Sequence, residues 1–144
     1  MKKKSFLVCI ILVIALLTAC SSSLATTSPN SQTALIQVVN NFDNNIRSIE
    51  LDFHQNGMQL TTQGAANADG SALKKGDILS FEVSSSDFDL NQPITIKANV
   101  KINNVKMFAG TVELIQLSKG NAYNFEITED TSSNLIFQKL EIVE

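Results

Sequence analysis

The chain has 144 residues, which is enough for one globular domain. Its formal net charge of −3 gives none of the basic footprint that nucleic-acid binding needs, so nucleic acid is excluded as an expected partner. With two cysteines, one histidine and no tryptophan, the chain has few residues for thiol, imidazole or sugar-stacking chemistry.

Residues 1–19 have the layout of a signal peptide. Three lysines follow Met1, and an apolar run then extends from Phe6 to Leu17. This run is shorter than the roughly 20 residues that a helix needs to span a bilayer, and its length is typical of a signal-peptide core. We therefore expect residues 1–19 to be removed on export.

The apolar run ends in Leu17-Thr18-Ala19-Cys20. This segment resembles the lipobox of bacterial lipoproteins, in which an aliphatic residue and two small residues precede a cysteine. The resemblance implies cleavage before Cys20, diacylglycerol on its sulfur and often a further acyl chain, such as palmitate, on the new amino group. It also implies an extracytoplasmic domain anchored to the bacterial cell membrane or outer membrane. The alternative is an ordinary secretory signal that ends near a cysteine.

Maturation in this way would leave the domain without a free thiol. Cys9 would leave with the signal peptide and Cys20 would carry lipid, so we expect no disulfide and no thiolate metal site. Loss of the three N-terminal lysines would leave eight basic residues against fourteen acidic ones, a net charge of −6. Anionic headgroups would repel such a domain, and lipid would hold it to the membrane.

Residues 20–33 are expected to form the lipidated cysteine and a flexible linker. The segment 21–33 is uncharged and rich in Ser and Thr, and a flexible chain of this length has ends about 20 Å apart on average. The globular domain is then expected to occupy residues 34–144.

From Ala34 onward, apolar and polar residues alternate with the period of β-strands, and no window has helical periodicity. The predicted strands lie at 35–39, 49–54, 79–83, 94–102, 105–117 (one or two strands), 123–127 and 135–143. Turn signals lie at 55–57, 69–70, 75–77 and 103–104. This pattern predicts an all-β fold, a small antiparallel β-sandwich of Ig-like type with seven to nine strands. The alternative is a small β-barrel.

Two segments of the chain echo one another. Leu73 to Ser84 and Leu117 to Thr128 share Leu, Lys-Gly, Asp or Asn, and Phe-Glu at matching positions. We favour the interpretation that one type of tight turn, with Gly at positive φ, is used twice. A duplicated half-sandwich is the alternative.

Glu50, Asp52 and His54 form the best candidate metal site. On a strand these side chains share one face at steps of about 6.6 Å, and carboxylates with imidazole suit zinc or a similar divalent ion. An alternating polar face is also what any solvated strand displays. We therefore predict that this face is solvated and binds no metal.

Asp87, Asp89 and Asn91 resemble the first half of an EF-hand calcium loop. Gln92 and Ala98 stand where that loop requires Gly and Glu, so we expect a solvated connection and no calcium site.

The sequence contains no nucleophile elbow, phosphate loop or zinc-helix motif, so we expect no enzyme. The expected function is a non-catalytic binding or accessory module of the cell envelope. The alternative is a structural or assembly subunit of an envelope complex; a metal-binding protein or an enzyme ranks behind both. No cofactor is expected apart from covalent lipid on Cys20, and the expected partners are the membrane and an envelope protein.

Overall fold

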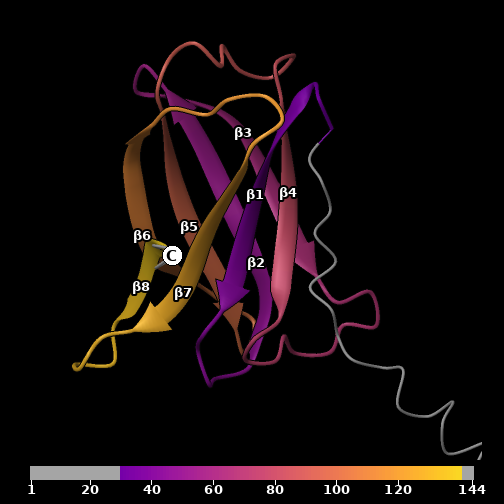
Figure 1. Ribbon diagram of the computed structural model, residues 1–144. Coiled ribbons are helices and arrows are strands. Elements are labelled where there is room, and N and C mark those ends of the chain that lie inside the picture. The colour runs from indigo at the N-terminus through magenta and orange to yellow at the C-terminus, as the bar shows by residue number, and fades with distance from the viewer. Residues whose placement is uncertain (1–29, 141–144) are drawn as a thin grey trace, which may run out of the picture.

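The computed structural model describes residues 30–140, which form eight β-strands (Figure 1). The strands are β1 (Thr33–Asn40), β2 (Ile46–Gln55), β3 (Met58–Ala66), β4 (Ile78–Ser84), β5 (Ile94–Ile102), β6 (Val105–Ile115), β7 (Ala122–Glu129) and β8 (Leu135–Lys139). The described part of the chain contains no helix long and apolar enough to cross a membrane.

The strands form two four-stranded sheets packed face to face. Sheet A has the order β4-β1-β7-β8 and sheet B the order β3-β2-β5-β6. All pairs are antiparallel except β1 and β7, which run parallel. The predicted all-β sandwich is therefore confirmed, with one parallel pair that the sequence pattern did not reveal, and the sheets are not closed into a barrel.

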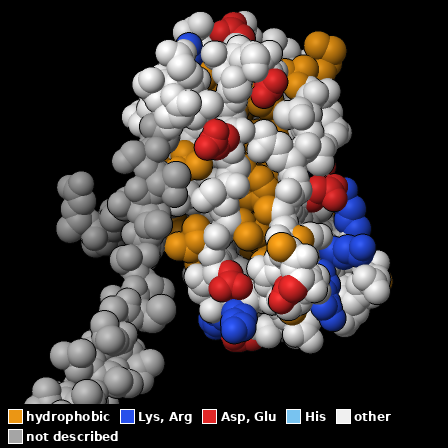
Figure 2. All heavy atoms as spheres, turned by 90° about the vertical axis from the view of Figure 1, so that its right-hand side faces the viewer, with side chains coloured by type: hydrophobic (Ala, Val, Ile, Leu, Met, Phe, Trp, Pro, Cys, Tyr) orange, Lys and Arg blue, Asp and Glu red, His pale blue; other side chains and the backbone are white. Residues whose placement is uncertain are grey.

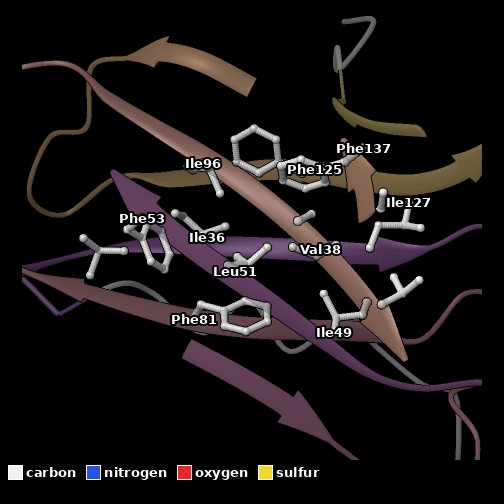
Figure 3. Close-up of a cluster of buried hydrophobic side chains, with 14 of the residues drawn as sticks. Ile36, Val38, Ile49, Leu51, Phe53, Phe81, Ile96, Phe125, Ile127 and Phe137 are labelled. Atoms are coloured by element: carbon white, nitrogen blue, oxygen red, sulfur yellow. The ribbon is translucent and has the colours of Figure 1, made fainter. Parts of the chain in front are cut away.

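The core lies between the two sheets and follows from the alternation along each strand. On β2, Ile49, Leu51 and Phe53 are fully buried. Figure 3 shows these side chains in one cluster with Phe81 and Phe125 from sheet A. Full burial of one such side chain stabilises the fold by about 1.5–3 kcal/mol, so the core can support the domain without a disulfide.

β3 is the one strand that the sequence did not predict. The side chains that β3 turns inward include Thr61 and Gln63, which are half-buried, and β3 has no run of alternating apolar residues. Its register is set by the Asn56-Gly57 turn, where both residues have positive φ (53° and 78°).

The two echoing segments place the same turn at opposite ends of β1. Gly76 and Gly120 have φ of 90° and 76°. The Gly76 amide donates to the Asn40 carbonyl (2.7 Å), and the Gly120 amide donates to the Thr33 carbonyl (2.8 Å). The prediction of a shared turn with Gly at positive φ is therefore confirmed.

The likeness extends beyond these turns to two units, β2–β4 and β5–β7. In each unit a hairpin of sheet B is followed by a strand of sheet A next to β1. The units meet where Leu51 of β2 pairs with Ala98 of β5. The first hairpin turn begins at Asn56, five residues after Leu51, and the second begins at Asn103, five residues after Ala98. β4 runs antiparallel to β1 and β7 runs parallel to it, so the two units are related by a pseudo-twofold axis. This arrangement has the geometry of the duplicated half-sandwich.

Candidate functional site

The structure places Glu50, Asp52 and His54 together on the outer face of sheet B, as the alternation predicted. The Asp52 carboxylate accepts hydrogen bonds from Thr62 Oγ1 (2.6 Å), Asn99 Nδ2 (2.9 Å) and Gln59 Nε2 (3.4 Å). These donors come from β3 and β5, so both carboxylate oxygens of Asp52 already accept hydrogen bonds within sheet B.

Glu50 is likewise engaged, because its Oε1 accepts a hydrogen bond from the Lys106 ammonium. The same contact raises the pKa of Lys106. Within residues 30–140, no group of three His, Cys, Asp or Glu side chains is arranged to hold a metal ion.

The loop around Asp87, Asp89 and Asn91 is held by its own hydrogen bonds. Asp89 Oδ1 accepts from the Asn91 backbone amide and the Asn91 side chain, both at 3.0 Å. Buried Gln55 donates to the Asp89 carbonyl (2.8 Å), and Phe88 is inserted against Phe53 in an edge-to-face contact with centroids 5.4 Å apart. The Asp89 carboxylate therefore shapes the loop.

A cleft of about 430 Å³ lies beside this loop. Its walls include Phe88, Asp89, Leu117 and Lys119. The cleft is at the end of the sandwich where β1 begins, because Thr33 pairs with Ser84 there.

A second concave region lies at the opposite end, on the outer face of sheet B. It consists of two hollows of about 190 and 620 Å³ that share Ser48, Lys101 and Asn104. Lys106 and Glu50 line the smaller hollow, and Arg47 lines the larger one. We call this region the basic hollow.

Sequence reasoning did not find the basic hollow, because its residues come from separate strands. Ser48 and Lys101 are directly opposite one another on β2 and β5, and Lys101 is opposite Lys106 on β6. The Asn103-Asn104 turn, correctly predicted, closes its end with both residues at positive φ (47° and 65°). To predict the hollow from the sequence, one would need to know that β2 pairs with β5, and no local sequence pattern specifies that pairing.

Cys20, residues 1–19 and the linker lie outside the described residues, apart from the linker's last few positions. Strand β1 begins at Thr33, one residue before the domain start expected from the sequence. The final predicted strand, 135–143, corresponds to β8, and residues 141–144 also lie outside the described range.

No protein-family profile and no curated protein matches the chain. Among solved structures, a protein from Eubacterium rectale studied by NMR is 13% identical, with a TM-score of 0.49, and the match covers 77% of this chain and 91% of that one. A disulfide-locked intermedilysin with human CD59 (9% identical, TM-score 0.41) and pneumolysin (8%, 0.39) each match over 78% of this chain. The chain spans about a quarter of those toxin chains (24%). With TM-scores below 0.5, these likenesses carry no functional argument.

Proposed function

We propose that the protein is a lipid-anchored, extracytoplasmic binding module of the bacterial cell envelope, held at its N-terminal side by lipid on Cys20. The observation that carries the proposal is the position of Thr33, where the uncharged linker meets β1. β1 has eight residues and is about 25 Å long. The basic hollow lies at the other end of the sandwich, on the outer face of sheet B. A tether entering at Thr33 would leave that hollow open to a ligand.

Binding is favoured over catalysis by how the polar side chains are used. Glu50, Asp52 and Asp89 accept hydrogen bonds from neighbouring side chains. An imidazole activates a nucleophile through a hydrogen bond to it, and a carboxylate often orients the ring. Within residues 30–140, the His54 ring is hydrogen-bonded to neither a hydroxyl nor a carboxylate. The two concave regions are lined mainly by polar and charged residues, as suits recognition of a polar group on a larger molecule.

Replacement of the two cysteines tests the anchor. Cys20→Ala should abolish incorporation of labelled fatty acid and block normal processing in a bacterial host, because the thiol is the lipid acceptor. Cys9→Ala is the matched control and should leave labelling unchanged. An intact mass of the mature wild type that shows no lipid would refute the proposal.

A structural or assembly subunit is the second candidate function, favoured by exposed apolar side chains on edge strand β6. Val105 and Phe108 are 60% and 61% exposed. Exposed apolar side chains of this kind can pack on another chain. Extraction of the lipidated protein from its own membrane in mild detergent should then give a stable complex that Phe108→Ser returns to the monomer mass. A monomer in both cases would rule this candidate out.

A further inference from the structure

Four of the eight basic residues beyond the predicted signal peptide lie on one face of an otherwise acidic domain. Three of them lie on the outer face of sheet B, namely Lys97, Lys101 and Lys106. The fourth, Arg47, lies at the irregularity between Ile46 and Ser48 and lines the basic hollow with Lys101. In Figure 2, which views the molecule from the right of Figure 1, Lys and Arg side chains gather along the right-hand border. Three of the four, Arg47, Lys101 and Lys106, line the basic hollow.

Lys101 stands directly opposite Lys106 across the β5–β6 pair. Like charges in this position destabilise a sheet. Glu50 compensates Lys106, but within residues 30–140 Lys101 makes no ion pair. Arg47 donates to the neutral Gly70 carbonyl (2.7 Å), which leaves its positive charge uncompensated too.

The pseudo-twofold axis shows that the fold does not require lysine here. Ser48, Lys101 and Lys106 are neighbours across three strands at one end of sheet B. At the other end the equivalent neighbours are Thr95, His54 and Gln59. The same scaffold therefore accepts a row without lysine, so the fold does not require the lysine pair.

The shape of the basic hollow suits a charged group. Two small residues line one side of it and leave it open, namely Ala66 at the end of β3 and Gly70 in the turn that follows. Asn103 and Asn104 are exposed at its end, and neither amide side chain is hydrogen-bonded within the described part of the chain. The hollow thus combines two uncompensated cations with unused amide donors.

We propose that the basic hollow binds an oxyanion, a phosphate or carboxylate carried on an envelope polymer, with Lys101 as its main contact and Arg47 beside it. Lys supplies a point charge, and Arg supplies directed donors, to such a group. Bound anion would also relieve the repulsion between Lys101 and Lys106. Only the choice of an envelope polymer rests on the proposed function; oxyanion binding stands on the hollow itself.

The test uses the full chain in non-ionic detergent at constant ionic strength. Fluorescein-labelled polyphosphate and fluorescein-labelled polygalacturonate serve as phosphate and carboxylate probes, and binding is followed by fluorescence anisotropy. Lys101→Gln should weaken binding about tenfold, the loss expected for one hydrogen bond to a charged group. Ala66→Phe, which would fill the hollow, should weaken it as well.

Lys139→Gln is the matched control, because it removes the same charge from an exposed position on β8 in the other sheet. It should leave affinity unchanged, and whichever probe depends on Lys101 identifies the oxyanion. The proposal fails if neither probe binds, or if the Lys101 and Lys139 substitutions weaken binding equally. Fatty-acid labelling of the Lys101 variant separates this failure from a failure of the anchor.

Discussion

The units β2–β4 and β5–β7 share one arrangement of strands but differ in what they expose. Each builds a hairpin with a two-residue turn at positive φ and then crosses to sheet A next to β1. Their outer faces diverge, because Asp52 of the first unit is hydrogen-bonded by Thr62, while Phe108 of the second unit stands exposed opposite Asn99. The inward positions therefore specify the fold, and the outward positions are available for function.

The units also close the sandwich differently at their outer edges. In the first unit, Gln63 Nε2 of β3 donates to the Glu82 carbonyl of β4 (2.9 Å), which joins the two sheets. In the second unit, the position equivalent to Gln63 is Gly110 of β6. Gln63 pairs with Leu51, and Gly110 pairs with Ala98, the counterpart of Leu51. There β8 packs directly against β6, with Phe137 as the neighbour of Gly110. One edge thus depends on a polar link and the other on close packing.

The largest expected difference between the units concerns their matched phenylalanines. Phe125 is fully buried on a central strand and stacks on Phe137 with centroids 5.2 Å apart, whereas Phe81 lies on edge strand β4. Phe125→Ala should cost about 4 kcal/mol of unfolding free energy and Phe81→Ala about 3 kcal/mol. Urea denaturation of a soluble chain beginning at Asn30, followed by circular dichroism, measures both. Near-neutral effects at both positions would contradict this core.

The next largest loss of unfolding free energy is expected where β8 packs against β6. Gly110 has φ of 154°, and a Cβ there would approach the Phe137 backbone nitrogen to 2.9 Å. Gly110→Ala should therefore destabilise by about 2–3 kcal/mol, since neither the backbone angle nor the neighbouring strand can yield easily. Gly64→Ala on β3 is the control, with its nearest contact at an ordinary 3.8 Å. Equal losses in the two variants would show that close approach is not the cause.

A substitution at the other edge, where Gln63 links β3 to β4, should cost less unfolding free energy than Gly110→Ala. Gln63→Ala removes the link to Glu82 and should cost about 1 kcal/mol, the typical net value of one hydrogen bond. Hydrogen exchange should also quicken at the β4 amides and not at β8. Unchanged exchange along β4 would mean that the link does not hold this edge.

Much of the fold was predictable because inward positions alternate locally. The pattern at Ile49, Leu51 and Phe53 identifies a buried strand face without any knowledge of its partners. β3 was not predicted because this edge strand turns Thr and Gln inward and so lacks alternating apolar residues. The parallel β1–β7 pair was not predicted because strand pairing depends on residues far apart in the sequence. The basic hollow was not predicted for the same reason, since Arg47 and Lys101 line one hollow only because the neighbouring Ser48 of β2 pairs with Lys101 of β5.

The smallest expected effect is at His54, the counterpart of Lys101. His54 is half-buried on the outer face next to Thr95 and Gln59, and the carboxylate of Asp52 is already satisfied by other donors. His54→Ala should change the unfolding free energy by no more than about 0.5 kcal/mol, as at most surface positions. Micromolar zinc should leave the melting temperature unchanged in the wild type and the variant alike. A rise of several degrees with zinc that disappears in His54→Ala would instead make Glu50, Asp52 and His54 a metal site, on the same face of sheet B as the basic hollow and sharing Glu50 with it.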